Sequence, residues 1–163
     1  MANHDTLKKG GTGALVGAAL ASAIALVAPW EGKRNTTYLD IVDVPTICYG
    51  HTGDDVKLGQ TLSDAQCSKL LGEDLQEAND AVNRCVKVPL KDNQRAAFVS
   101  FTYNLGGGAF CKSTLLAKIN AGRIDEACRD MGKWVYAGGQ RIQGLVNRRA
   151  AETNVCLGGK ISG

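Results

Sequence analysis

The sequence lacks several features that would assign it to a common functional class. It contains no Cys-x-x-Cys pair and only two histidines among its 163 residues, so we expect no metal site and no cofactor. The formal net charge of +3 is too small and too dispersed for a nucleic-acid-binding surface. The chain also has no internal repeat. At this length it holds one modest domain, or two small lobes that share a core.

Composition indicates a folded protein with disulfides. Hydrophobic residues make up 44% of the chain and charged residues 21%, which argues against bulk disorder. Six cysteines are many for a protein of a reducing compartment, so we expect disulfides rather than unpaired core thiols. Sequence alone does not select among the possible pairings. Pairing neighbours along the chain gives Cys48 with Cys67, Cys85 with Cys111, and Cys128 with Cys156.

The N-terminal region contains an uncharged run rich in glycine and alanine, Gly10–Ala28, preceded by Lys8 and Lys9. Its length is close to the roughly 20 residues that cross a bilayer as a helix. Few of its residues are strongly apolar, so insertion would be favourable by only about 2 to 4 kcal/mol. These residues are Leu15, Val16, Leu20, Ile24, Leu26 and Val27. The lysines would keep the N-terminus in the cytoplasm and send Glu31 across the membrane.

A cleaved secretory signal is the competing interpretation of the same run. Leu26-Val27-Ala28 resembles a cleavage site. Cleavage there would leave Pro29 as the first mature residue, where proline is poorly tolerated, so we favour retention. The Gly13-x-x-x-Gly17 spacing would permit close packing of a partner helix, but it arises easily in so small-residue-rich a run and does not predict a dimer.

Periodicity and capping signals predict an α+β fold that is predominantly helical. Tyr38–Tyr49 has the composition of a β-hairpin or a three-stranded sheet. Ser63 and Gln66 form a capping box that opens a long helix. Further helices are expected from Asp92 to the glycines at 106–108, over Ser113–Ala121, over Asp125–Tyr136 and over Ile142–Leu157.

A short acidic motif carries the functional signal. Glu31 lies between Trp30 and Gly32, Asp40 follows nine residues later, and Thr46 six beyond that, before Tyr49-Gly50-His51. This segment resembles the catalytic segment of the phage-type lysozymes. The stretches Phe98–Gly106, Trp134–Gly139 and Gly144–Arg149 are also similar to segments of that family, so the resemblance covers residues 31–157. The uncharged run before Glu31 narrows it to endolysins with a signal-anchor-release segment.

The resemblance implies a lysozyme-like two-lobe fold. Residues 1–30 would be the signal-anchor-release segment and residues 31–163 the catalytic domain. That domain would have a small lobe over about 31–62, an inter-lobe helix over about 63–86 and a helical lobe over about 87–157. The implied activity is hydrolysis of the β-1,4 bond between N-acetylmuramic acid and N-acetylglucosamine in peptidoglycan glycan strands. The enzyme would be inactive while residues 10–28 tether it to the host inner membrane, and active as a periplasmic monomer after release.

Glycoside hydrolysis needs a proton donor at the leaving oxygen and a second group that activates water. We expect Glu31 to be the acid, with its proton retained by desolvation beside Trp30. Asp40 would be the base and Thr46 would hold the water with it. This arrangement implies inversion, with the carboxyls roughly 6.5 to 9.5 Å apart. The resemblance implies that Arg148 lies near Glu31, with Arg149 as the fallback. The other expected supporting residues are Asn104, and His51 in a structural pair with an inter-lobe carboxylate.

Other interpretations of the same residues remain open. Glu31 could favour the first turn of a helix that begins at Trp30, Asp40 and Thr46 could be turn and strand residues, and Arg148 could solvate a helix face. The protein could also be a membrane-anchored module that binds peptidoglycan without cleaving it, or a lytic transglycosylase, although the presence of Asp40 favours hydrolysis. In the released state, we expect the small-residue face of the N-terminal segment to dock on the domain and set Glu31 opposite Asp40.

Overall fold

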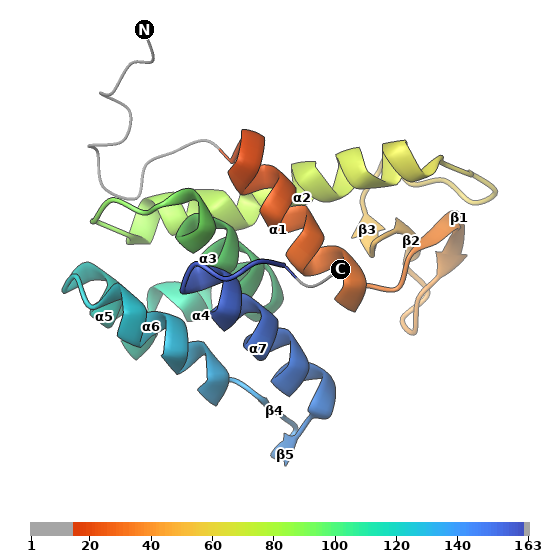
Figure 1. Ribbon diagram of the computed structural model, residues 1–163. Helices are drawn as coiled ribbons and strands as arrows, with labels where there is room; N and C mark the ends of the chain where they lie inside the picture. Colours follow the sequence, from red (N-terminus) through yellow and green to blue (C-terminus); the bar gives the residue numbers. More distant parts are fainter. Residues whose placement is uncertain (1–14, 162–163) are drawn as a thin grey trace, which may run out of the picture.

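The computed structural model describes residues 15–161 and has a mainly helical α+β fold with two small antiparallel sheets (Figure 1). The elements in chain order are α1 (Gly17–Val27), the 3-10 helix η2 (Ala28–Trp30), β1 (Arg34–Leu39), β2 (Pro45–Cys48), β3 (His51–Thr52), α2 (Asp64–Cys85), α3 (Asp92–Leu105), α4 (Gly107–Cys111), α5 (Thr114–Asn120), α6 (Ile124–Asp130), the 3-10 helix η3 (Met131–Lys133), β4 (Tyr136–Ala137), β5 (Gln140–Arg141) and α7 (Gln143–Cys156).

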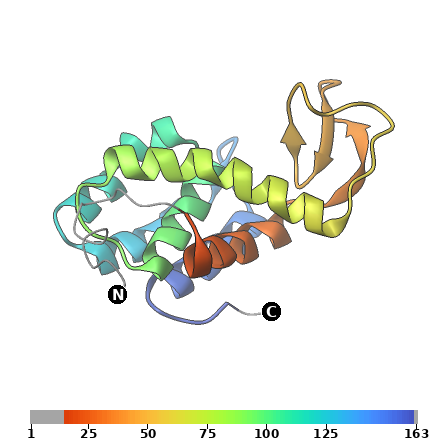
Figure 2. The same ribbon diagram turned by 90° about the horizontal axis from the view of Figure 1, so that it is seen from above.

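The long helix α2 joins a sheet lobe to a helical lobe (Figure 2). The sheet lobe contains β1, β2 and β3 in that order, and its small core includes Ile47 and Val56. The larger core lies among the helices, α1 included. Within the sheet, β1 begins at Arg34, earlier than the segment predicted from composition.

The predicted capping box does open α2. The Gln66 backbone N–H donates to Ser63 Oγ at 3.1 Å, and the Ser63 N–H donates to Gln66 Oε1 at 2.8 Å. These bonds satisfy two backbone donors that a helix start otherwise leaves without partners. The buried residues Leu71, Leu75 and Val82 recur at helical spacing and turn one face of α2 toward the core.

The prediction of one helix over residues 125–136 is wrong. The α-helix ends at Asp130, a 3-10 turn follows, and Tyr136 pairs with Arg141 in the hairpin of β4 and β5. Gly138 and Gly139 form the two-residue turn with φ values of 57° and 78°. Paired positive φ values are typical of the tight hairpin turns that glycine favours, so this local signal overrides the helical pattern.

Helix α1 packs as part of the core of the helical lobe. Gln76 of α2 holds the residues just before α1, because its Nε2 donates to the Leu15 carbonyl oxygen at 2.9 Å. Leu20 and Ile24 lie over Gly72 of α2, where a side chain would meet them. The closest partner is α3, and small side chains on α1 permit that approach. The buried residues follow a helical face: Leu15, Ala19, Ala23, Leu26 and Val27.

Within residues 15–161, the structure has no helix with the length and apolar character needed to cross a bilayer. Lys8, Lys9 and the first part of the Gly10–Ala28 run, Gly13 included, lie outside the described residues. The predicted bilayer-spanning segment is therefore described only in part, and the part described is the docked helix α1.

Three disulfides join neighbouring cysteines along the chain, which is the connectivity expected from the sequence. Cys48–Cys67 links β2 to α2, and Cys85–Cys111 links the end of α2 to α4. Cys128–Cys156 links α6 to α7. Each lobe therefore carries its own covalent cross-link, and the helical lobe carries two.

Candidate active site

Glu31 lies just after the 3-10 helix η2 and contacts the far end of the chain. Its backbone is extended, so the alternative that placed it in the first turn of a helix is wrong. Arg148 of α7 donates from Nη1 to Glu31 Oε1 at 3.1 Å. The Arg148 side chain is 4% exposed and that of Glu31 is 29% exposed. Among the described residues, Oε2 of Glu31 accepts no hydrogen bond, so one carboxyl oxygen is anchored and the other is free to act.

A buried ion cluster on α7 holds Arg148 in place. Arg148 Nε donates to Glu152 Oε1 at 3.3 Å, and Arg149 Nη1 donates to Glu152 Oε2 at 2.5 Å. Ser100 of α3 adds a hydroxyl bond of 2.6 Å to the same carboxylate. Burial raises the pKa of Glu152, while Arg149, Ser100 and Arg148 act against that rise. Arg148 is therefore a fixed buried contact and not a residue that solvates a helix face.

Glu152 was not among the residues predicted from the sequence. Its spacing of three and four residues from two arginines on one helix was the available signal. Of the two candidate arginines, Arg148 makes the contact with Glu31, and the fallback Arg149 turns to Glu152 and to the side-chain oxygen of Asn104. Asn104 thus supports the cluster from α3.

Asp40 and Thr46 lie on either side of the turn between β1 and β2. Asp40 Oδ1 accepts from the backbone N–H groups of Val42 and Val44 at 2.8 and 2.9 Å. Thr46, which is 4% exposed, donates from Oγ1 to the Val44 carbonyl at 2.9 Å. Asp43 adopts a left-handed conformation that closes the turn. Within the described residues, Oδ2 of Asp40 makes no hydrogen bond and is free to accept one from water.

A polar groove of about 530 Å³ lies between β3, α2 and the end of α3. Tyr103 lines it, and burial together with the charges of Glu31 and Asp74 raises the pKa of Tyr103 to about 12. The phenol therefore stays protonated and can donate a hydrogen bond in the groove. Thr102 also lines it, with a buried Oγ1 that has no partner among the described residues. Both residues fall within Phe98–Gly106, although neither was predicted from the sequence as a site residue.

His51 occupies a structural position between the lobes. Its Nδ1 lies 2.9 Å from Asp74 of α2, and its Nε2 lies 3.0 Å from Asp55. Burial lowers the pKa of His51, but the hydrogen bonds to Asp74 and Asp55 outweigh it, so the pKa is raised. His51 thus joins the sheet lobe to the inter-lobe helix α2, which is the structural pair predicted from the sequence.

Comparison with known proteins identifies the relatives of the chain. A family model described as phage lysozyme matches residues 28–152. The SAR-endolysin of Bacteriophage PS119 is 42% identical over 166 aligned residues, which cover 98% of this chain and 99% of that protein. The solved endolysin from Escherichia coli O157:H7 phage FAHEc1 has a TM-score of 0.78 at 30% identity, covering 94% of this chain and 99% of that one. A mutant of P22 lysozyme has a TM-score of 0.77 at 35% identity, covering 84% and 96%.

Proposed function

We propose that this chain hydrolyses the β-1,4 bond between N-acetylmuramic acid and N-acetylglucosamine. The premise is that the chain belongs to the phage lysozyme family and is a phage endolysin with muramidase-type glycosidase activity. The observation that carries the proposal is the contact between Arg148 and Glu31, which orients a partly exposed carboxyl with one oxygen that has no partner in the described residues. The substrate of the family is peptidoglycan, and the polar groove beside Tyr103 offers donors and acceptors for sugar hydroxyls.

The proposed mechanism is an inverting two-carboxylate hydrolysis. Glu31 gives its proton to the glycosidic oxygen as the bond to the anomeric carbon breaks. Asp40 accepts a proton from a water held with Thr46, and the water oxygen attacks the anomeric carbon from the opposite face. The turn supports this role for Asp40, because Oδ1 is held by two backbone N–H groups while Oδ2 remains available.

The position of α1 supports activation by release, which is part of the proposed function. While residues 1–30 tether the protein to the inner membrane, with the N-terminus in the cytoplasm and residues 31–163 in the periplasm, α1 is not available to pack on α3. Glu31 then stays at the membrane surface and does not reach Arg148. Release lets the buried face of α1 dock, and the short connection through η2 delivers Glu31 to the site. The disulfides agree with a folded domain in an oxidising compartment.

The decisive experiment is clearing of purified peptidoglycan by the oxidised full chain. We expect Glu31→Gln to lower the rate by about two to four orders of magnitude, which is the usual contribution of a general acid. Glu126→Gln is the matched control, because Glu126 is an exposed acid that pairs with Arg123 on the surface. Unchanged clearing by Glu31→Gln would exclude Glu31 as the acid.

Analysis of the products separates the remaining alternatives. Reducing muramic acid ends with inverted anomeric configuration support the proposed mechanism, and retained configuration would reject its inverting step. Anhydro ends would indicate a lytic transglycosylase. Binding of peptidoglycan without any new ends, by the parent and the variant alike, would indicate a non-catalytic binding module. Sedimentation of the released protein tests the proposed monomer.

A further inference from the structure

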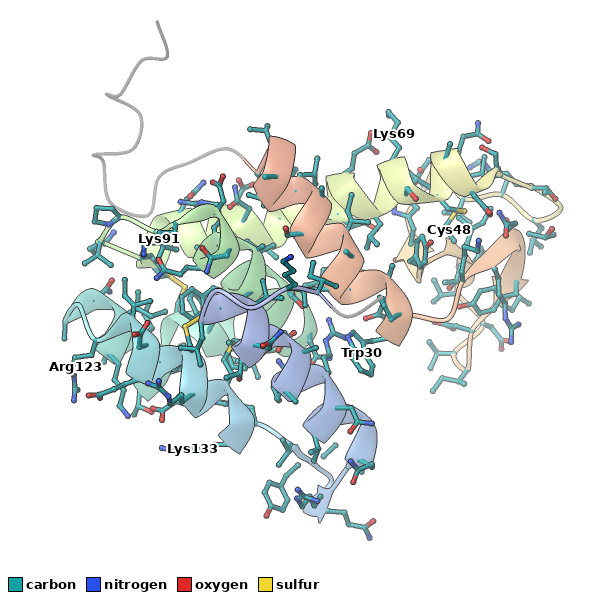
Figure 3. The ribbon with its side chains drawn as sticks, in the orientation of Figure 1. Trp30, Cys48, Lys69, Lys91, Arg123 and Lys133 are labelled. Atoms are coloured by element: carbon teal, nitrogen blue, oxygen red, sulfur yellow. A yellow bond between two sulfur atoms is a disulfide. The ribbon has the colours of Figure 1, made fainter. Side chains whose placement is uncertain are left out.

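A basic pocket of about 880 Å³ lies apart from the polar groove, between α7, the end of α6 and the β4–β5 hairpin. Its charged lining residues are all cations: Arg129, Lys133, Arg141 and Arg149. None of the residues that line it lines the groove beside Tyr103. Figure 3 shows Lys133 projecting from this side of the helical lobe, away from the sheet lobe where Cys48 lies.

The positive charge around this pocket is poorly compensated. Within residues 15–161, neither Arg129 nor Arg141 has a carboxylate at ion-pair distance, and both are exposed. Lys133 pairs with Asp130 at 3.0 Å, but that carboxylate is shared with Lys118. A concave surface lined by one sign of charge concentrates the field and attracts a counter-ion.

Arg149 provides a second and independent observation. Its side chain is 2% exposed, and its two terminal nitrogens bond Glu152 and Asn104. Its Nε, however, is buried and has no hydrogen-bond partner in the described part of the chain. A buried N–H without an acceptor is uncommon in folded proteins and calls for one. Because Arg149 also lines the basic pocket, a small rearrangement of its buried side chain would let a bound anion supply that acceptor.

We propose that this pocket binds a phosphate-bearing anion, which accepts hydrogen bonds from the guanidinium groups of Arg129 and Arg141 and from Nε of Arg149. Phosphate fits the pocket better than a lone carboxylate because its several oxygens can accept from separate guanidinium groups at once. The volume exceeds that of a phosphate ion, and the exposed ring of Tyr136 lines the same pocket. The group attached to the phosphate is therefore organic, such as a glycerol or a sugar.

The test is a titration of the full-length oxidised protein with inorganic phosphate, at constant ionic strength set with chloride. The readout is the Nε–H resonance of Arg149 in a heteronuclear NMR spectrum. If Arg149 had only a structural role, phosphate would not shift this resonance. We expect a saturable shift. In the double variant Arg129→Gln, Arg141→Gln its midpoint rises at least about tenfold, because charge-assisted hydrogen bonds are the stronger class.

Arg123→Gln is the matched control, since Arg123 is an exposed arginine of the same lobe that pairs with Glu126 and does not line the pocket. Its midpoint stays at the parent value. Because the substituted residues are exposed, we expect the variants to have the same melting temperature as the parent. Unfolding would then not explain a change in the phosphate midpoint. No saturable shift, an equal shift with chloride alone, or the same midpoint in parent and double variant would overturn the proposal.

Two further probes separate the sources of the phosphate. Glycerol phosphate tests a soluble ester, and vesicles of phosphatidylglycerol test a lipid headgroup. Phosphatidylcholine vesicles are the control for membrane binding through the N-terminal segment. If phosphatidylglycerol vesicles compete with inorganic phosphate for the parent protein but not for the double variant, the ligand is a lipid headgroup. Competition by glycerol phosphate alone supports a soluble ester. Because the readout is binding, either result stands apart from the catalytic mechanism proposed above.

Discussion

Truncation of Leu26 to alanine tests whether docked α1 is part of the working enzyme. Leu26 is 2% exposed and belongs to the same core as Phe98 and Phe101 of α3. Truncating a buried leucine to alanine costs about 2 to 5 kcal/mol. For a protein of this size each kcal/mol lowers the melting temperature by about 2 to 4 °C, so we expect a fall of about 4 to 20 °C.

The same loss acts on docking itself. Since about 1.4 kcal/mol corresponds to a tenfold change in an equilibrium constant, the cost lowers the docking constant of α1 by about thirty-fold to several thousand-fold. Glu31 is connected to α1 through only the three residues of η2, so undocking removes it from Arg148. We therefore expect kcat for wall clearing to fall by a larger factor than the factor by which KM changes.

Calorimetry and turbidity clearing on the released full chain measure the two effects. Val16→Ala is the control on the same segment, because Val16 is 62% exposed and its truncation should change stability by no more than about 0.5 kcal/mol. If Leu26→Ala melted within the range of that control and cleared the wall at the parent rate, α1 would contribute neither to the core nor to the site.

Three further substitutions test the inter-lobe pair, the buried cluster and a cross-link. His51→Asn should cost about 1 to 3 kcal/mol near pH 5.5 and less at pH 9 in urea unfolding. The pKa of His51 is raised in the folded state. Its contribution to the free energy of unfolding is therefore complete below the unfolded pKa of about 6.5 and is lost as the pH rises through the folded pKa. Equal losses of stability at both pH values would reject the charged pair. Arg148→Met should destabilise by about 3 to 5 kcal/mol, since it leaves buried carboxylate charge short of a partner, and should abolish clearing; calorimetry showing parent stability would contradict this, and Arg148→Lys should recover part of the loss. Replacing Cys128 and Cys156 by serine opens a loop with a sequence separation of 28 and should cost roughly 3 to 4 kcal/mol, with an unchanged melting temperature as the refuting result.

Local signals predicted the elements where they were unambiguous. The capping box at Ser63 and Gln66 marked the start of α2, because both partners lie within one turn. The segment over residues 125–136 failed because its last part precedes Gly138 and Gly139, and a tight hairpin prevailed over the helical pattern. The Gly-Gly pair was visible in the sequence, and it outweighs periodicity when both occur together.

The candidate site was predictable only as far as neighbouring residues define it. Glu31, Asp40 and Thr46 are recognisable by their spacing within a short segment, and their catalytic roles stay predictions. The partner of Glu31 was named by resemblance, whereas the burial of Arg148 against Glu152 and Ser100 depends on how α7 packs on α3. Such contacts join residues far apart in the chain, so no local pattern encodes them.

By itself, the sequence determined a mainly helical α+β fold, the cysteines available for cross-links and the spacing of an acidic motif that resembles that of the phage-type lysozymes, because each depends on composition or on short-range spacing. The sequence predicted that the N-terminal segment docks on the domain, but only the tertiary structure decided that α1 packs on α3. The buried face of α1 is apolar and combines the small residues Ala19 and Ala23 with larger aliphatic ones, and such a face is compatible with lipid or with a protein core, since both remove it from water. The complementary surface of α3, formed by residues remote in the chain, supplies the packing that selects the core.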